Sequence, residues 1–400
     1  MTIAFTGRVT LKALADCGKW NRPLPDVKWG FPLGSEIVKR LVARGHTVVV
    51  VTEHMVDAIE RFKCQTERGG LEVWLVPSRR RSRWTFLTLF SKETKGMRTA
   101  IREIKPDVVF AQWTYHNAYA GLTSGYPTLV VAHDSPWRIA WVNGGLQAWI
   151  KAFYSQMLVF PRVKNLTTVS PYIVNELRRF NRYRAEVKII PNGIAANGVF
   201  DHIEPRTSIR AKATTVAVVA DWSALKNVKT FFSALDWSAR KNFRPRIRAV
   251  VFGSGLCWDG PAGDWLKKSG LNAENLELRG LQERSVIAKF LRDEADIFCS
   301  PSLEESFGMV FIEAMLQGVP CVGGEKSGAV PWVLGNGDAG VLTDVTKPEV
   351  LARTLERVML DYELRKRLSE AGVKRVKENF DIERVVDMYE MELKRVAGIR

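Results

Sequence analysis

The chain has 400 residues, more than the roughly 250–300 at which a single hydrophobic core usually stops growing, so two domains are expected. Hydrophobic residues make up 46% and charged residues 26%, an ordinary globular composition that excludes wholesale disorder. No run of about 18 apolar residues suits a membrane-spanning helix, and Met1–Trp20 lacks the apolar core of a signal peptide. We therefore expect a cytoplasmic protein.

Positive charge is concentrated in the first half of the chain. The net charge is +16; residues 1–200 hold 29 Lys and Arg against 14 Asp and Glu, whereas residues 201–400 hold 30 against 29. A basic surface attracts anionic lipid, nucleic acid or an acidic substrate rather than determining a fold. The excess predicts an anionic partner for the first half, and a solvated basic face is the alternative.

Short apolar runs rich in β-branched residues recur along the chain, as in strands that are buried on both faces. They are Thr47–Thr52, Val108–Ala111, Thr128–Ala132, Val187–Ile190, Val216–Ala220, Ala249–Phe252, Asp296–Cys299 and Cys321–Val322. Helical spacing lies between them, as where Ile37, Val38 and Leu41 share one face. The alternation predicts an α/β fold of two Rossmann-like domains, whose parallel sheets face a cleft and bind ligands at the carboxyl ends of their strands.

A glycine-flanked segment and a histidine stand out in the first half. Gly30-Phe-Pro-Leu-Gly34 precedes a helix predicted over Ser35–Arg44. His133, followed by Asp134, comes directly after the predicted strand Thr128–Ala132, at its ligand-binding end. On residue chemistry alone, a single histidine is more often a structural residue than a functional one.

A basic segment, Ser78–Trp84, carries four arginines beside Trp84. The apolar residues Phe86, Leu87, Leu89 and Phe90 follow it. Cations next to aromatic and aliphatic side chains are typical of a segment that lies on an anionic membrane surface. The alternative is an exposed basic loop in front of an ordinary core helix.

The boundary between the domains is predicted near Asn197–Ile209, which separates two strand-like runs. This gives an N-terminal domain over residues 1–197, a C-terminal domain over 198–380 and a final helix over 381–400. That helix carries an apolar stripe formed by Ile382, Val385, Val386, Tyr389, Leu393 and Val396. The stripe predicts either a helix that returns to the first domain or one that closes the second.

The most informative motif lies in Ser300–Val322, where seven residues separate Glu305 from Glu313. A loop carries Glu305, and a helix is predicted from Phe307–Gly308 to Gln317. The amino end of a helix directs free N–H groups and partial positive charge outward, which suits a diphosphate. The two carboxylates can accept hydrogen bonds from sugar and ribose hydroxyls.

This stretch reads Glu305-Ser-Phe-Gly-Met-Val-Phe-Ile-Glu313-Ala-Met-Leu-Gln-Gly318-Val-Pro320 and resembles the signature of the GT-B glycosyltransferases of family 4. That signature is a Glu, seven residues, a second Glu, Ala-Met and Gly-x-Pro. The resemblance spans nearly the whole chain. Further segments match the family in order: the glycine loop Gly30–Gly34, His133, the interdomain turn Pro191-Asn-Gly193-Ile194, Lys226 and the glycine turn Gly253-Ser-Gly255.

The resemblance implies a role for each matching residue. Lys226 and the helix start at Gly308 would stabilise the leaving diphosphate, Glu313 would hold the ribose, and Glu305 and His133 would orient the sugar. Glu305, His133 and Lys226 are therefore the candidate catalytic residues. The candidate donor-binding residues are Gly34, Lys226, Gly253, Glu305, Phe307, Gly308, Met309 and Glu313.

Two positions depart from the family pattern. Asp221 stands where the family usually has an arginine, and a carboxylate beside a diphosphate is unfavourable. Lys229 or Arg279 would then have to supply the missing cation, unless the donor binds differently or the activity is weakened. Trp332 stands where the family commonly has a glutamate.

The implied reaction is transfer of a sugar, with retention, from a nucleoside-diphosphate sugar to a hydroxyl of a glycan, a lipid-linked or a small-molecule acceptor. The donor is a co-substrate, and no other cofactor and no metal is expected, because no Asp-x-Asp motif stands in the second half. The basic half favours an acidic acceptor and peripheral attachment to the inner face of the membrane. The alternatives are a GT-B sugar-nucleotide epimerase and a non-catalytic protein that binds anions or nucleic acid. Nucleic acid is the less expected partner, since no RNA-binding or helix-turn-helix signature is present.

Overall fold

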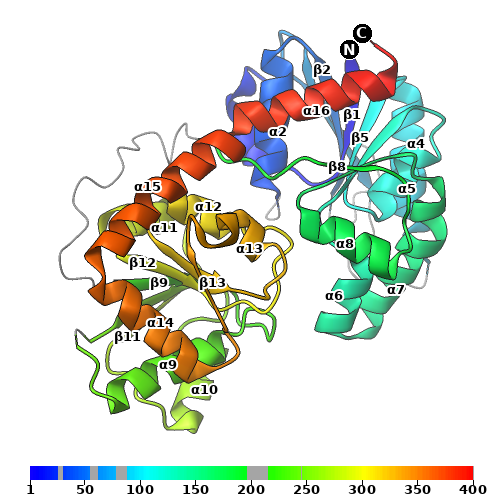
Figure 1. Cartoon of the computed structure of the whole chain (residues 1–400). Coiled ribbons are helices and arrows are strands. Elements are labelled where there is room, and N and C mark those ends of the chain that lie inside the picture. Colours follow the sequence, from blue (N-terminus) through cyan, green and yellow to red (C-terminus); the bar gives the residue numbers. More distant parts are fainter. Residues whose placement is uncertain (26–29, 55–61, 78–87, 196–214, 245, 400) are drawn as a thin grey trace. The chain divides into compact units, whose positions relative to one another are not determined.

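The computed structural model describes residues 1–25, 30–54, 62–77, 88–195, 215–244 and 246–399 (Figure 1). The chain forms two compact units, the first made of Met1–Gly193 with Ile382–Arg400 and the second of Ile194–Asp381. The basic segment Ser78–Trp84 and the expected boundary Asn197–Ile209 lie outside the described residues.

The described part of the first unit contains an eight-stranded sheet in the order β3-β4-β2-β1-β5-β6-β7-β8. Neighbouring strands are parallel except β3, which runs antiparallel to β4. The strands are β1 (Thr2–Thr6), β2 (Thr47–His54), β3 (Phe62–Gln65), β4 (Leu71–Pro77), β5 (Val108–Gln112), β6 (Thr128–Ala132), β7 (Asn165–Thr168) and β8 (Val187–Ile189). All residues of β5 and β6 are buried, as expected for strands covered by helices on both faces.

Helices cover this sheet and connect its strands. They are α1 (Leu11–Leu14), α2 (Pro32–Ala43), α4 (Ser91–Ile104), α5 (His116–Leu122), α6 (Pro136–Asn143), α7 (Leu146–Tyr154), α8 (Pro171–Phe180) and α16 (Ile382–Ala397). Throughout the ranges that the structure describes, in both units, no helix has the length and apolar character needed to cross a bilayer.

The second unit has a parallel sheet, which in the described residues runs β11-β10-β9-β12-β13-β14. Its strands are β9 (Thr215–Val219), β10 (Arg248–Phe252), β11 (Leu276–Gly280), β12 (Ile297–Ser300), β13 (Cys321–Gly324) and β14 (Val341–Thr343). Its helices are α9 (Val228–Arg240), α10 (Pro261–Ser269), α11 (Arg284–Asp293), α12 (Met309–Leu316), α13 (Val330–Val333), α14 (Pro348–Leu360) and α15 (Tyr362–Asn379). The prediction of an α/β protein with two parallel-sheet domains is confirmed.

The strand order of the second sheet reverses beside β9. From β9 the chain builds β10 and β11 on one side, then crosses to build β12, β13 and β14 on the other. The loops after β9 and β12 therefore leave the same edge of the sheet and diverge in opposite directions. Such a switch point opens a crevice at the carboxyl ends of the strands, where ligands of open α/β sheets bind.

The last helix, α16, belongs to the first unit. Its apolar stripe is buried there except for the half-buried Val396, and the ring of Tyr389 lies 5.0 Å from that of Phe110. Arg44, the C-cap residue of α2, forms ion pairs with three carboxylates of α16: Glu383 at 3.0 Å, Asp387 at 2.7 Å and Glu390 at 3.0 Å. Packing and charge thus both attach the end of the chain to its beginning.

The chain passes between the units twice, and the two passages are hydrogen-bonded to each other. The backbone N–H of Ile194 donates to the carbonyl of Phe380 at 2.8 Å, and Ile194 forms an isolated bridge with Asp381. Gly193 adjoins this point, where an added Cβ would lie 3.0 Å from the Cα of Ile382. A glycine is required there because the two backbones approach so closely.

Replacing Tyr389 with alanine should lower the free energy of unfolding by about 3–5 kcal/mol, because removal of a buried aromatic ring leaves a cavity. Met391→Ala, at an exposed position of the same helix, is the matched control and should change stability by less than about 0.5 kcal/mol. Urea denaturation followed by circular dichroism measures both. Equal effects would contradict the packing of α16 on the first unit.

Candidate functional site

An ion pair joins the loops that follow β9 and β12 in the second unit. The Nζ atom of Lys226 lies 2.6 Å from Oε1 of Glu305. Asn227 adds to this connection, since its Nδ2 donates to the carbonyl of Pro301, in the loop after β12, at 3.1 Å and to that of Val345, which follows β14, at 2.8 Å. Lys226 and Glu305 are thus held together at the switch point, where the fold favours ligand binding.

The backbone turns sharply between Glu305 and α12. Gly308 is the N-cap of this helix and has a φ of +96°, a left-handed conformation that favours glycine. Met309 is the first residue of the helix and is half-buried. Upstream, the carbonyl of Glu305 accepts a hydrogen bond from the N–H of Ala329 at 2.8 Å. The loop is therefore fixed at both ends, with the amino end of α12 at the carboxyl edge of the sheet.

The ring of Phe307 is buried among aromatic residues. It makes edge contacts with Trp332, at 6.0 Å between ring centroids, and with Phe380, at 5.4 Å. Trp332 also packs on Phe380 at 5.7 Å. The ring of Phe307 is therefore taken up by this cluster, and only its backbone faces the candidate site. Trp332, which stands where the family commonly has a glutamate, completes the cluster.

Glu313 is buried on α12 and forms an ion pair with Arg284, the first residue of α11. Burial raises the pKa of the Glu313 carboxyl, and the Arg284 guanidinium opposes this shift. The sequence analysis did not identify Arg284. A cation in the first turn of a helix opposes the helix dipole, and that unfavourable position was the available signal.

Asp221 is exposed in the loop after β9, between two backbone hydrogen bonds. The N–H groups of Ala220 and Trp222 donate to the carbonyls of Phe252 and Ser254, both at 3.0 Å. These bonds tie the loop to the end of β10 on either side of Asp221. The carboxylate thus stands at the carboxyl edge of the sheet, where the family usually has a guanidinium.

The two cations considered as substitutes for that guanidinium have other contacts. Lys229 lies over the rings of Trp222 and Trp265, with its Nζ atom 5.4 and 5.6 Å from the centroids. Arg279 donates to Glu277 at 2.8 Å and lies 4.8 Å from the ring of Phe290. Both side chains are therefore engaged by neighbouring side chains: Lys229 by the two indoles, and Arg279 by Glu277 and Phe290.

Gly253 has a structural reason to be glycine. Its φ is +135°, and an added Cβ would lie 1.5 Å from the carbonyl oxygen of Ala220, which no adjustment could relieve. Its N–H donates to the carbonyl of Gly280 at 2.7 Å. The residue lets the ends of β9 and β10 approach each other, and so sets the path of the loop that leads to Lys226.

In the first unit, His133 follows β6 and lies among aromatic rings. Its Nε2 is 2.8 Å from Oε1 of Gln112, and its ring contacts Phe31 at 5.2 Å and Trp113 at 4.7 Å. Burial lowers the pKa of the imidazole to about 3, so the side chain is neutral at physiological pH. It can take part in hydrogen bonds but does not supply a positive charge.

Gly34 lies in the first turn of α2, which begins at Pro32 and not at Ser35 as predicted. Proline is favoured in the first turn because it lacks an N–H that would be left without a partner there. An added Cβ on Gly34 would lie 2.7 Å from the ring of Phe31. The glycine therefore leaves room for the ring that packs against His133.

Asp134 and Tyr115 form a pair beside His133 that the sequence analysis did not assign. The Tyr115 hydroxyl donates to Oδ1 of Asp134 at 3.0 Å. Burial raises the pKa of the Asp134 carboxyl from 3.8 to about 6, although this hydrogen bond and Lys151 both oppose the shift. A carboxyl that titrates near neutrality is thus built into the end of β6.

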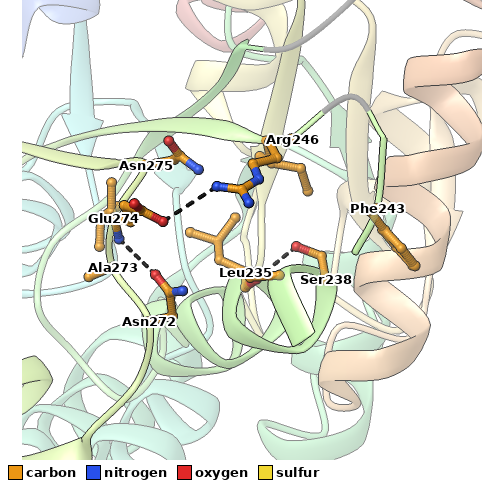
Figure 2. A pocket seen from close by; sticks show the side chains of 11 residues that line it. Leu235, Ser238, Phe243, Arg246, Asn272, Ala273, Glu274 and Asn275 are labelled. Atoms are coloured by element: carbon orange, nitrogen blue, oxygen red, sulfur yellow. Dashed lines mark hydrogen bonds and ion pairs between the residues drawn. The ribbon is translucent and has the colours of Figure 1, made fainter. Parts of the chain in front are cut away.

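A surface pocket in the second unit lies away from this candidate site. Figure 2 shows its lining, with Arg246 directed toward Glu274 and with Leu235 and Ser238 of α9 below them. Arg246 precedes β10 and Asn275 precedes β11. The pocket is therefore at the amino ends of the strands, the edge opposite to Lys226 and Glu305. Nowhere in the described ranges do three or more His, Cys, Asp and Glu side chains gather as metal ligands.

Solved structures share this architecture of two parallel-sheet units. Sucrose-phosphate synthase from Thermosynechococcus elongatus matches with a TM-score of 0.78 and 18% identity, over 100% of this chain and 99% of that one. The Anabaena protein HepE in complex with UDP and glucose matches with a TM-score of 0.66 and 16% identity, over 99% and 100%. The fold is the GT-B fold of glycosyltransferases.

Family models cover most of the sequence. Residues 35–197 match the model of Glycosyltransferase Family 4, and residues 199–375 match that of Glycosyl transferases group 1. N-acetyl-alpha-D-glucosaminyl L-malate synthase of Bacillus anthracis is 36% identical over 96 residues, which are 24% of this chain; the match spans only 25% of that protein's length. The chain belongs to the GT-B glycosyltransferases of the family 4 type.

Replacing Asp134 with asparagine should change how stability depends on pH. Because the folded state raises this pKa, it holds the proton more tightly, so the contribution of Asp134 is complete below pH 3.8 and is lost as pH rises through about 6. The stability difference between parent and Asp134→Asn should therefore shift in favour of the variant across that window. Thermal melts at a series of pH values measure it, with Asp264→Asn on α10 as an exposed control; parallel curves would contradict the raised pKa.

Proposed function

We propose that the protein transfers a sugar from a nucleoside-diphosphate sugar to an acceptor hydroxyl, with retention at the anomeric carbon. The observation that carries the proposal is the Lys226–Glu305 ion pair at the carboxyl edge of the second sheet, next to the amino end of α12. Family membership supports the class of reaction. The donor is a co-substrate, and the proposal includes no other cofactor and no metal.

The diphosphate of the donor would replace Glu305 as the partner of Lys226. Lys226 is neutralised by Glu305 before a ligand enters, and a diphosphate offers it a higher charge density than a carboxylate does. Transfer of Lys226 to the diphosphate would release Glu305 to accept hydrogen bonds from sugar hydroxyls. The free N–H groups at the start of α12 would stabilise the same diphosphate as it leaves.

Glu313 is the proposed ligand of the ribose. A diol is best held by an ionised carboxylate, which accepts two hydrogen bonds, but burial favours its neutral form. Arg284 opposes that effect and so favours the charged form of Glu313. Arg284 is therefore included in the proposed donor site as a positioning residue for Glu313.

His133 would hydrogen-bond the transferred sugar from the first unit. Its neutral imidazole suits contact with hydroxyls and would not compete with Lys226 for the phosphates. No side chain is assigned as a nucleophile; the leaving phosphate would help to deprotonate the acceptor on the same face, and the protein would supply position and charge. The basic first half supports an acidic glycan or a lipid-linked acceptor at the inner face of a membrane.

A sugar-nucleotide epimerase of the same fold is the second candidate, because it would use the same donor site. Product analysis in the absence of an acceptor separates the two. Release of an altered free sugar nucleotide would support the epimerase, whereas slow hydrolysis to nucleoside diphosphate and sugar would support the transferase.

The proposed donor site predicts a specific thermal response. At a ligand concentration of about one hundred times Kd, a donor should stabilise the second unit by about 2.7 kcal/mol and raise its melting temperature by several degrees. UDP-sugars are tested first, since the similarly folded Anabaena protein was solved with UDP and glucose. Glu313→Ala should abolish most of the response, and Glu370→Ala, an exposed change on α15, should retain it. No response to any sugar nucleotide would remove the proposal.

Asp221→Arg tests the unusual carboxylate directly. An arginine at this position would replace repulsion of the diphosphate by attraction, so the donor should bind at least about tenfold more tightly, equivalent to about 1.4 kcal/mol. Asp264→Arg makes the same change of charge at an exposed site on α10 and should leave the affinity within about twofold. Isothermal titration calorimetry gives both values; weaker binding in Asp221→Arg would mean that Asp221 takes part in holding the donor.

A further inference from the structure

The hairpin formed by α6 and α7, together with the π-helical turn Ser155–Val159 that continues α7, exposes large apolar side chains. Trp141 is 71% exposed, Leu146 74%, Phe153 56% and Met157 67%. A large exposed apolar patch of this kind marks a site that binds another protein, a membrane or a ligand. We call these four residues the hairpin surface.

The four side chains belong to one continuous stripe. Leu146 and Phe153 lie seven residues apart on one face of α7, where Trp149 fills the gap between them, and Met157 follows in the π-helical turn that continues the helix. Trp137 on α6 contacts the rings of Trp149 at 5.9 Å and Phe153 at 4.9 Å. Trp141 lies one turn further along α6, so the stripe extends across both helices.

Positive charge is concentrated in the part of the sequence that contains this stripe. Residues 135–185 contain eight Lys and Arg but a single acidic residue, Glu176, which is buried beside Arg138. The exposed cations are Arg162, Lys164, Arg178, Arg179, Arg182 and Arg184. Several of them adjoin the hairpin, because α6 packs on α8 and Asn181 at the end of α8 donates to Gln156 at 2.9 Å (Figure 1).

We propose that the hairpin surface docks on an anionic lipid bilayer, with its tryptophan, phenylalanine and aliphatic side chains in the headgroup region and the α8 cations beside the lipid phosphates. Exposed aromatic residues with adjacent Arg and Lys are the composition that binds at this interface. A symmetric contact with a second copy would bring the same cations against one another. Nucleic acid would match the charge but has no apolar surface for Leu146 and Met157.

This inference goes beyond the proposed transfer reaction and does not depend on it. The two are compatible, because an acceptor anchored in the bilayer would be presented to the unit that carries the hairpin. Vesicle binding is measured without any donor, whereas the donor response is measured without vesicles. Failure of one therefore leaves the other intact.

The test is flotation of the full chain with vesicles of phosphatidylcholine alone or mixed with phosphatidylglycerol. The parent should float with the mixed vesicles, bind neutral ones at least about tenfold more weakly, and detach as salt is raised. Trp141→Ser with Phe153→Ser should reduce the partition coefficient by at least about tenfold through loss of the apolar contacts. Arg178→Glu with Arg179→Glu should do the same through loss of charge.

Matched controls lie outside the hairpin surface. Met391→Ser removes a comparably exposed apolar side chain, 69% exposed on α16, and Lys326→Glu reverses an exposed charge in the second unit; both should float like the parent. Circular dichroism and melting temperature establish that each variant is folded. No flotation of the parent, equal flotation of all variants, or a dimer in sedimentation velocity that Trp141→Ser with Phe153→Ser abolishes would each overturn the proposal.

Discussion

The ion pair between Lys226 and Glu305 depends on the reversal of strand order beside β9, and the rest of the candidate donor site depends on that pair. Parallel neighbours end at one edge of the sheet, so the loops after β9 and β12 must share it. Asn227 then locks the loops together, and Gly308 turns the chain into α12. The sheet topology alone would not fix the positions of the charged side chains. Each of these contacts restricts them further.

Opposite charges alternate through this region, from Lys226 with Glu305 to Arg284 with Glu313. Without a ligand, both carboxylates are therefore neutralised by side chains. An anionic ligand that binds Lys226 or Arg284 would compete with these carboxylates. The binding free energy of such a ligand is then the difference between its interaction with the cations and that of the carboxylates it replaces. Because this difference is small compared with either interaction, a single nearby charge such as Asp221 is expected to change the affinity strongly.

The sequence predicted the fold class well because its strands are nearly uniform apolar runs, and strands such as β5 and β6 are in fact buried throughout. It predicted less about contacts. Nothing in the motif around Glu305 reveals that Phe307 turns its ring into a cluster with Trp332, or that α2 begins early enough to include Gly34. The ion pair of Arg284 with Glu313 was missed for the same reason. It joins helices that follow different strands, and the spacing of residues along the sequence does not show that these two helices lie side by side.

The position of α16 has a consequence for synthesis of the protein. The second unit is one continuous stretch of chain, whereas the first is completed only by α16, which contributes Tyr389 against Phe110. During translation the second unit can therefore assemble while the first still lacks a helix and exposes the apolar surface that α16 will cover. The unit whose synthesis begins first is therefore the unit that is completed last.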